Sequence, residues 1–236
     1  TALDNTGGTI IAAGDTVVHA GELSNAGGQL QAAGQGRLQV TADGLLDNTA
    51  GIIAAGGDMD LAAQRLDNTA GTLHHAGDGQ LDITVPVFDG QGGTIASNGT
   101  LTLVGDQVDL ENGTTIAHAI SVDATVLTTA GGQMQAAGPG VLSLAVGGTL
   151  DNAGGTIAGN GSLAVTAGTL DNSSGYLGAA GTGTSLVDVA GQLDNAAGTI
   201  ETGTDLALST AHLDNTAGTI RSAGGDLHID AGVLDG

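Results

Sequence analysis

Apolar and polar residues alternate along the chain in short stretches bounded by glycine, aspartate and asparagine. Side chains two positions apart lie on the same face of a β-strand, so an apolar pair with this spacing predicts a short, half-buried strand. No unit combines ten glycine-free residues with apolar spacings of three and four, and we expect no helix beyond a cap. The pairs are Leu38/Val40, Met59/Leu61, Leu81/Ile83, Leu101/Leu103, Ile120/Val122, Leu142/Leu144, Leu163/Val165, Val187/Val189, Leu206/Leu208 and Leu227/Ile229.

A second pattern gives these strands a period of about 21 residues. The triplet Leu-Asp-Asn or a variant starts at residues 3, 23, 46, 66, 88, 110, 127, 150, 170, 193, 213 and 234. The unit that starts at Leu110 has its next large apolar residue one position early, at Ile116. In the other units a large apolar residue follows seven positions after the start, at Ile10, Leu30, Ile53, Leu73, Ile95, Met134, Ile157, Leu177, Ile200 and Ile220.

One such unit cannot fold alone. Burying four Leu- or Ile-sized side chains yields roughly 6–12 kcal/mol, whereas ordering about 20 backbone residues costs roughly 20–40 kcal/mol. Stacked copies would supply the missing hydrogen bonds and cover both faces of each inward side chain, which is the logic of a solenoid. We therefore predict an all-β, parallel β-helix solenoid of about eleven coils, with residues 1–236 as a single repeat segment. Both ends lie within the repeat, and we expect the segment to be a fragment of a longer filament.

Composition narrows the classes of partner. Three arginines and no lysine stand against 25 acidic residues, for a net charge of −22. Nucleic-acid binding needs cationic side chains that neutralise phosphates, and this chain has few. Anionic membrane surfaces repel a chain of negative net charge. We therefore expect neither nucleic-acid binding nor membrane insertion. No stretch approaches the roughly 20 apolar residues of a membrane-spanning helix. The absence of cysteine removes disulfides and cysteine metal sites, and we expect no cofactor.

The pattern L-D-N-x-x-G-x-I-x-A-x-G resembles the repeat of filamentous haemagglutinin and the shaft repeats of contact-dependent growth-inhibition effectors. Residues 46–57 and 150–158 are good examples, and in-phase copies cover nearly the whole chain. The resemblance implies a right-handed parallel β-helix, exported by two-partner secretion through an outer-membrane transporter. It also implies a location in the secreted or cell-surface filaments of Gram-negative bacteria.

The third position of the motif is asparagine in nine copies. Asparagine tolerates left-handed backbone angles at a corner, and stacked side-chain amides can hydrogen-bond along a column. We predict a structural ladder that fixes the register of the coils. Its members are Asn5, Asn25, Asn48, Asn68, Asn112, Asn152, Asn172, Asn195 and Asn215.

The second position carries a carboxylate in ten copies. A column of carboxylates could collect calcium, which prefers several oxygen ligands. Aspartate at a turn also accepts hydrogen bonds from nearby backbone amides, and we favour this structural interpretation over a calcium site. The residues are Asp4, Asp47, Asp67, Asp89, Glu111, Asp151, Asp171, Asp194, Asp214 and Asp235.

Candidate catalytic chemistry is sparse. The six histidines are interpreted as solvated or edge residues, because zinc needs three or four converging ligands. Phe88 and Tyr176 are the only aromatic residues, and Phe88 occupies a core position of the motif. A carbohydrate-active β-helix enzyme needs one carboxyl in a distinct environment, which identical repeats do not offer. We expect no enzymatic activity.

Residues 84–130 depart most from the repeat. They contain Pro86, Phe88, Gly90 in place of asparagine, the early Ile116 and an interval of 17 residues. Proline cannot donate to a β-ladder, and it suits a strand edge or a turn. We interpret this stretch as a bent or bulged coil, with a contact site as the alternative.

These patterns together favour a structural role. We expect a stiff shaft segment of a secreted or cell-surface exoprotein, either an adhesin or a toxin-delivery stalk. Its partners would be further coils of the same chain and the outer-membrane transporter. A direct adhesin that binds a cell-surface receptor through its outer faces is the main alternative, and a carbohydrate-active enzyme is the other.

Overall fold

A computed structural model describes residues 1–235 of the 236-residue chain. The described chain is built of parallel β-strands and divides into two compact units, Thr1–His118 (unit 1) and Ala119–Gly236 (unit 2). Each unit is a β-solenoid, and the two together contain about eleven turns. Within residues 1–235 no helix is long and apolar enough to span a bilayer.

Most coils of unit 1 contain three strands. The first is a short strand with the motif triplet: β1 (Ala2–Asp4), β4 (Glu22–Ser24), β7 (Leu45–Asp47), β10 (Arg65–Asp67) and β13 (Val87–Asp89). The second carries the inward apolar residue: β2 (Thr9–Ala12), β5 (Gln29–Ala32), β8 (Ile52–Ala55), β11 (Thr72–His75), β14 (Thr94–Ser97) and β16 (Thr114–Ala117). The third carries the alternating pair: β3 (Thr16–Ala20), β6 (Leu38–Ala42), β9 (Met59–Ala62) and β12 (Gln80–Thr84).

In the last coil of unit 1 and throughout unit 2, the third strand runs on into the next motif triplet. β15 (Thr100–Asp109) is the first of these long strands, and it pairs with both β12 and β13. The long strands of unit 2 are β17 (Ala119–Thr128), β19 (Leu142–Asp151), β21 (Leu163–Asp171), β23 (Ser185–Asp194), β25 (Leu206–Asp214) and β27 (Leu227–Asp235). Its short strands are β18 (Gln133–Ala136), β20 (Thr156–Gly159), β22 (Tyr176–Ala179), β24 (Thr199–Thr202) and β26 (Thr219–Ser222).

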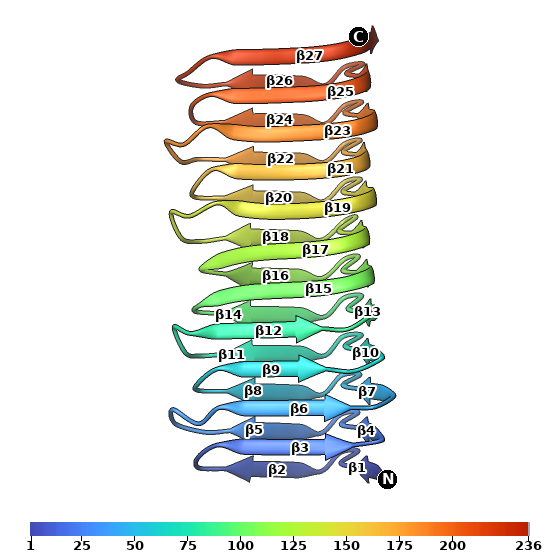
Figure 1. Ribbon diagram of the computed structural model, residues 1–236, viewed down its shortest axis with the longest axis vertical. Helices are drawn as coiled ribbons and strands as arrows, with labels where there is room; N and C mark the ends of the chain where they lie inside the picture. Colours follow the sequence, from blue (N-terminus) through green and yellow to red (C-terminus); the bar gives the residue numbers. More distant parts are fainter. Residues whose placement is uncertain (236) are drawn as a thin grey trace. The chain divides into compact units, whose positions relative to one another are not determined.

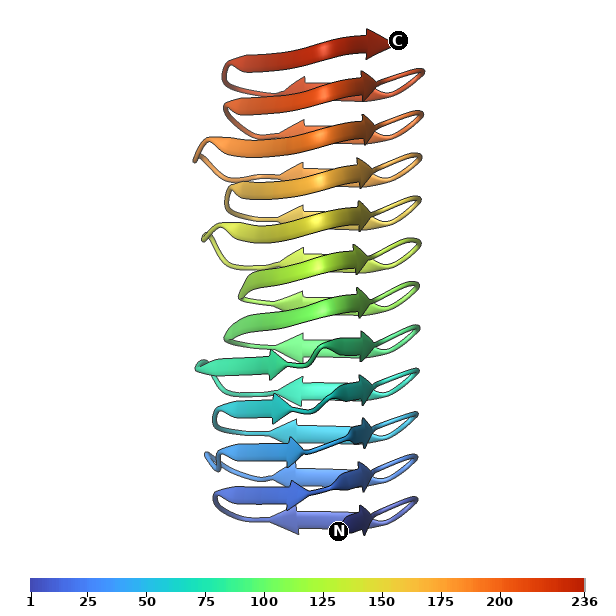
Figure 2. The same ribbon diagram turned by 45° about the vertical axis from the view of Figure 1, so that its right-hand side comes forward.

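Both units wind in the same sense. In Figure 1 the nearer strands run to the right as the chain climbs, and the fainter, more distant strands return to the left, which makes each coil right-handed. Figure 2 shows the short linker between the two nearer strands of a coil in unit 1 and the continuous strand that replaces them in unit 2. The predicted parallel, all-β solenoid is therefore confirmed in each unit.

The core is the aliphatic interior that the repeat predicts. Equivalent residues stack in register, as in the pairing of Leu30 with Ile53 in unit 1 and of Ile157 with Leu177 in unit 2. All four side chains are fully or almost fully buried. Phe88 is buried at the position of the motif leucine, paired with Leu66. Inward leucine, isoleucine and valine therefore cover one another from coil to coil, which a single coil could not achieve.

The sequence pattern places one copy of the motif two residues too late. The structure pairs Phe88 with Val108 and Asp89 with Asp109, so this coil starts at Val108 and not at Leu110. The inward position seven residues later is Thr115, paired with Ile95, whereas Ile116 is 38% exposed. The early apolar residue and the 17-residue interval therefore come from the wrong phase. The sequence Leu110-Glu111-Asn112 imitates the motif next to its true position.

Pro86 lies in a gap between strands, where a residue without a backbone N–H is tolerated. It lies between β12 and β13, and its carbonyl accepts hydrogen bonds of 2.9 Å from the backbone amides of Asp106 and Gln107. The earlier coils of unit 1 have a gap at the same place without a proline, so Pro86 suits this gap but does not create it.

Candidate functional site

The most regular polar feature of unit 1 is a column of buried asparagine side chains. Each residue directly follows the motif strand, so the same turn brings each side chain to the same place in its coil. The Nδ2 of Asn5 donates to Oδ1 of Asn25 at 2.6 Å, Asn25 donates to Asn48 at 2.7 Å, and Asn48 donates to Asn68 at 2.7 Å. The last three side chains are completely buried. Buried amides of this kind need partners, and the column supplies them from coil to coil.

Unit 2 contains an equivalent column. Asn152 donates to Asn172 at 2.8 Å, Asn172 to Asn195 at 2.7 Å, and Asn195 to Asn215 at 2.7 Å. Thr129 occupies the asparagine position of the preceding coil, and its hydroxyl donates to Oδ1 of Asn152 at 3.0 Å. Eight of the nine asparagines singled out from the sequence therefore lie in two columns of four.

Asn112 is the exception, and its assignment to the ladder is wrong. Because the coil starts at Val108, the ladder position is Leu110, whose side chain is almost fully buried. Asn112 lies two residues further along with a φ of 54°, and its amide donates to Glu111 at 3.2 Å in an exposed position. Asparagine thus serves this fold in two ways, as a stacked amide and as a residue in the left-handed region.

A glycine three residues after each ladder asparagine makes room for the column. At Gly51 a Cβ would lie 2.1 Å from the backbone oxygen of Asn25 and 2.7 Å from Oδ1 of Asn48. Gly175 has the same surroundings in unit 2, with 2.3 Å to the oxygen of Asn152 and 2.8 Å to Oδ1 of Asn172. The glycine of the motif is therefore fixed by close packing against the asparagines.

The aspartates at the second motif position cap turns. Oδ1 of Asp47, Asp151 and Asp171 accepts a hydrogen bond from the backbone amide two residues later, at 2.8–3.0 Å. The hydroxyl and then the backbone amide of Thr6 lower the pKa of Asp4. The backbone amide and then the hydroxyl of Thr216 lower the pKa of Asp214. Asp109 takes this role in its coil and accepts from the amide of Glu111, so Glu111 does not belong to the column. No group of three or more potential metal ligands converges among residues 1–235.

The histidines differ in their surroundings. His74 is exposed on the outer face of β11, and His75, the next residue, points inward and is completely buried. The interpretation of every histidine as solvated is therefore wrong for His75. Its Nδ1 lies 2.8 Å from Oγ of Ser97, and its buried Nε2 has no hydrogen-bond partner. Burial lowers the pKa of this imidazole. His212 is half-exposed, and its Nε2 lies 2.8 Å from the carboxylate of Asp235.

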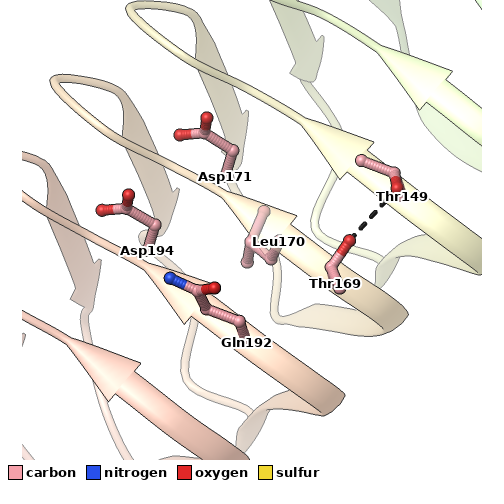
Figure 3. Close-up of a pocket in the computed structure, with 6 residues that line it drawn as sticks. All are labelled: Thr149, Thr169, Leu170, Asp171, Gln192 and Asp194. Carbon is pink, nitrogen blue, oxygen red and sulfur yellow. Dashed lines mark hydrogen bonds between the residues drawn. The ribbon is translucent and has the colours of Figure 1, made fainter.

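An open groove crosses the outer surface of unit 2 beside the motif strands. Figure 3 shows the carboxylates of Asp171 and Asp194 on neighbouring strands, with Thr149, Thr169 and Gln192 beside them. Both carboxylates accept hydrogen bonds from backbone amides of their own turns. The hydroxyl of Thr169 donates a hydrogen bond to the hydroxyl of Thr149 at 3.1 Å. The two aspartates are thus equivalent turn caps in adjacent coils. An acid–base pair would need carboxyls in different environments.

Comparisons with known proteins agree with this repeat geometry. A family model described as the haemagglutinin repeat matches residues 1–50, 33–85, 78–154, 135–197 and 181–235. A search of curated proteins and a search of solved structures each find no match to the chain. The matched segments run through the chain from residue 1 to residue 235, and the chain belongs to the haemagglutinin repeat family.

Proposed function

We propose that this chain is a shaft segment of a large filamentous exoprotein, either an adhesin or a contact-dependent toxin-delivery stalk. The haemagglutinin repeat occurs in structural and adhesive proteins, which are generally secreted or located at the cell surface. A shaft holds distal modules away from the cell, and it needs stiffness and repetition more than a reactive centre. In this proposal residues 1–236 act as one segment, exported through an outer-membrane two-partner transporter of a Gram-negative bacterium.

The buried asparagine columns carry the proposal. Their hydrogen bonds are added to the backbone ladder and exist only when successive coils are in register. A one-residue slip would break them and would also turn the aliphatic core outward. Polar groups that are buried and fully paired in this way favour one arrangement of the coils and resist bending.

Deleting whole coils from the parent exoprotein tests this function. Removal of residues 150–192 takes out two coils and joins Thr149 to Leu193, which keeps the phase of the motif. A shaft should still be exported, should keep its distal activity and should become shorter by about 10 Å, since stacked strands are about 4.8 Å apart. Loss of the distal activity from a protein that is still exported would contradict the proposal.

One observation favours a second function, direct adhesion. Tyr176 lies on the outer face of β22, is 37% exposed and covers Gly178, where a Cβ would be 2.4 Å from its ring. Exposed tyrosines are frequent anchors of protein interfaces. A direct adhesin should bind cell envelopes as a purified chain, and Tyr176→Ala should weaken that binding while Thr156→Ala, at the equivalent position one coil earlier, should not. A shaft without a receptor should show no binding in either form.

A further inference from the structure

His75 interrupts a column of small residues in unit 1. The equivalent positions in the neighbouring coils are Ala55 and Ser97, which pair with it in parallel register. An imidazole fits there because the next turn carries a glycine with no side chain: at Gly77 a Cβ would lie only 3.0 Å from Nε2 of His75. This coil therefore buries a titratable ring where its neighbours bury a methyl or hydroxyl group.

The hydrogen bonds around the ring suit a neutral imidazole. Oγ of Ser97 accepts the backbone amide of Gly99 at 3.1 Å, which leaves its own hydrogen to donate to Nδ1 of His75 at 2.8 Å. In that arrangement the proton of the ring is on Nε2, which is buried without a partner. A second proton, on Nδ1, would point at the hydroxyl hydrogen of Ser97 and break this hydrogen bond. The ring would then carry a full positive charge in the interior while its Nε2–H has no acceptor, which costs free energy.

We propose that His75 makes its coil an acid-sensitive point of opening in unit 1. When the ring takes up a proton, the coil gains free energy by opening, because the imidazolium then reaches water. The opening breaks the contact with Ser97 and loosens the pairing of β11 with β14. The rest of the unit keeps its aliphatic core, so the response is confined to the coils next to the ring.

The surrounding charges oppose this response without cancelling it. Asp58 and Asp78 favour the protonated ring, as does the backbone of Gly57, whereas His74 disfavours it. Desolvation is the largest influence, and the pKa of His75 is lowered from its ordinary value of 6.5. A lowered pKa means that folded stability is complete above about pH 6.5 and is lost as the pH falls from there through the pKa of the folded state.

Hydrogen exchange of the whole chain at pH 7.5 and pH 5.0, corrected for intrinsic rates, tests the proposal. Peptides from β11 and β14 should show an opening constant that rises at pH 5.0 by up to about 30-fold, the limit for a histidine of pKa 6.5 that is neutral when folded. His75→Ala restores the small residue of the column and should abolish the rise. His74→Ala removes the exposed neighbour and should keep it. An equal rise in His75→Ala and in the wild type would overturn the proposal, as would no rise in the wild type.

The wild-type protein gives an independent readout that does not depend on a variant folding. The imidazole signal of His75 can be followed by NMR as the pH is lowered. The pKa of His75 should lie below the ordinary histidine value of 6.5, and exchange in β11 and β14 should begin as the ring titrates. A His75 midpoint at or above 6.5 would overturn the proposal.

Discussion

The side-chain amide of Asn152 donates a 2.8 Å hydrogen bond to Oδ1 of Asn172, its counterpart in the next coil, and both side chains are completely buried. The same amide lies 3.1 Å from the backbone oxygen of Tyr176. Truncating Asn172 would remove the side-chain acceptor of Asn152 Nδ2 and the side-chain donor to Asn195 Oδ1. An unsatisfied buried polar group costs about 1–3 kcal/mol.

We therefore expect Asn152→Ala and Asn172→Ala each to lower the free energy of unfolding by about 1–3 kcal/mol. The melting temperature should fall by several degrees, which calorimetry can measure. Asn112→Ala is the matched control, because the structure places Asn112 outside both columns and alanine already occupies the same turn position, with similar φ, at Ala50 and Ala70. Equal losses in Asn172→Ala and Asn112→Ala would show that the column contributes nothing.

The glycine beside the column gives a second prediction. Gly175→Ala would place a Cβ 2.3 Å from the backbone oxygen of Asn152, a contact that forces two coils apart. We expect a loss above about 2 kcal/mol, as for other overpacked sites, measured by urea denaturation. Gly154→Ala is the control: its φ is 61°, but a Cβ there meets nothing within 4 Å, and alanine stands at the same turn position elsewhere. Comparable losses in the two variants would mean that backbone strain, not the column, fixes these glycines.

Variants of the aspartate column distinguish turn capping from calcium binding. Asp171→Asn keeps an acceptor for the amide of Ser173 and removes the repulsion from Asp151 and Asp194, so stability should be unchanged or slightly higher. Asp171→Ala should cost about 1 kcal/mol, because the amide loses its partner. Calcium should not change the melting temperature of the wild type. A calcium-dependent rise that disappears in Asp171→Asn would contradict turn capping as the role of this residue.

The period and the chemistry of the turns could be predicted from the sequence because each copy repeats the same physical requirement. An inward leucine must be packed against the next coil, a buried amide needs a hydrogen-bond partner, and a crowded turn needs glycine. The residue types of Leu46, Asn48 and Gly51 therefore recur together in successive copies. The asparagine columns and the aspartate turns follow from these requirements, as does the buried Phe88.

The errors arose where one copy contains two overlapping candidates for the motif. Val108-Asp109-Leu110 is the true start, but Leu110-Glu111-Asn112 matches the consensus more closely. Only the pairing with Phe88 distinguishes them. The burial of His75 escapes the sequence pattern for another reason. Strand alternation puts His74 and His75 on opposite faces without saying which face is inside, although the inward Leu73, two residues earlier, indicates that His75 shares its face.

Acid should destabilise the turns through the aspartates, and Asp214 offers a clean test. The backbone amide of Thr216 and then its hydroxyl lower the pKa of Asp214 below the ordinary 3.8. A lowered carboxyl pKa contributes stability that is present above about pH 4 and is lost as the pH falls through the folded value. Asp214→Asn should therefore flatten part of the decline in melting temperature below pH 4, whereas Asp188→Asn, at an exposed position of β23, should leave the decline unchanged. The same decline in the wild type and both variants would show that this hydrogen bond does not distinguish the folded from the unfolded chain.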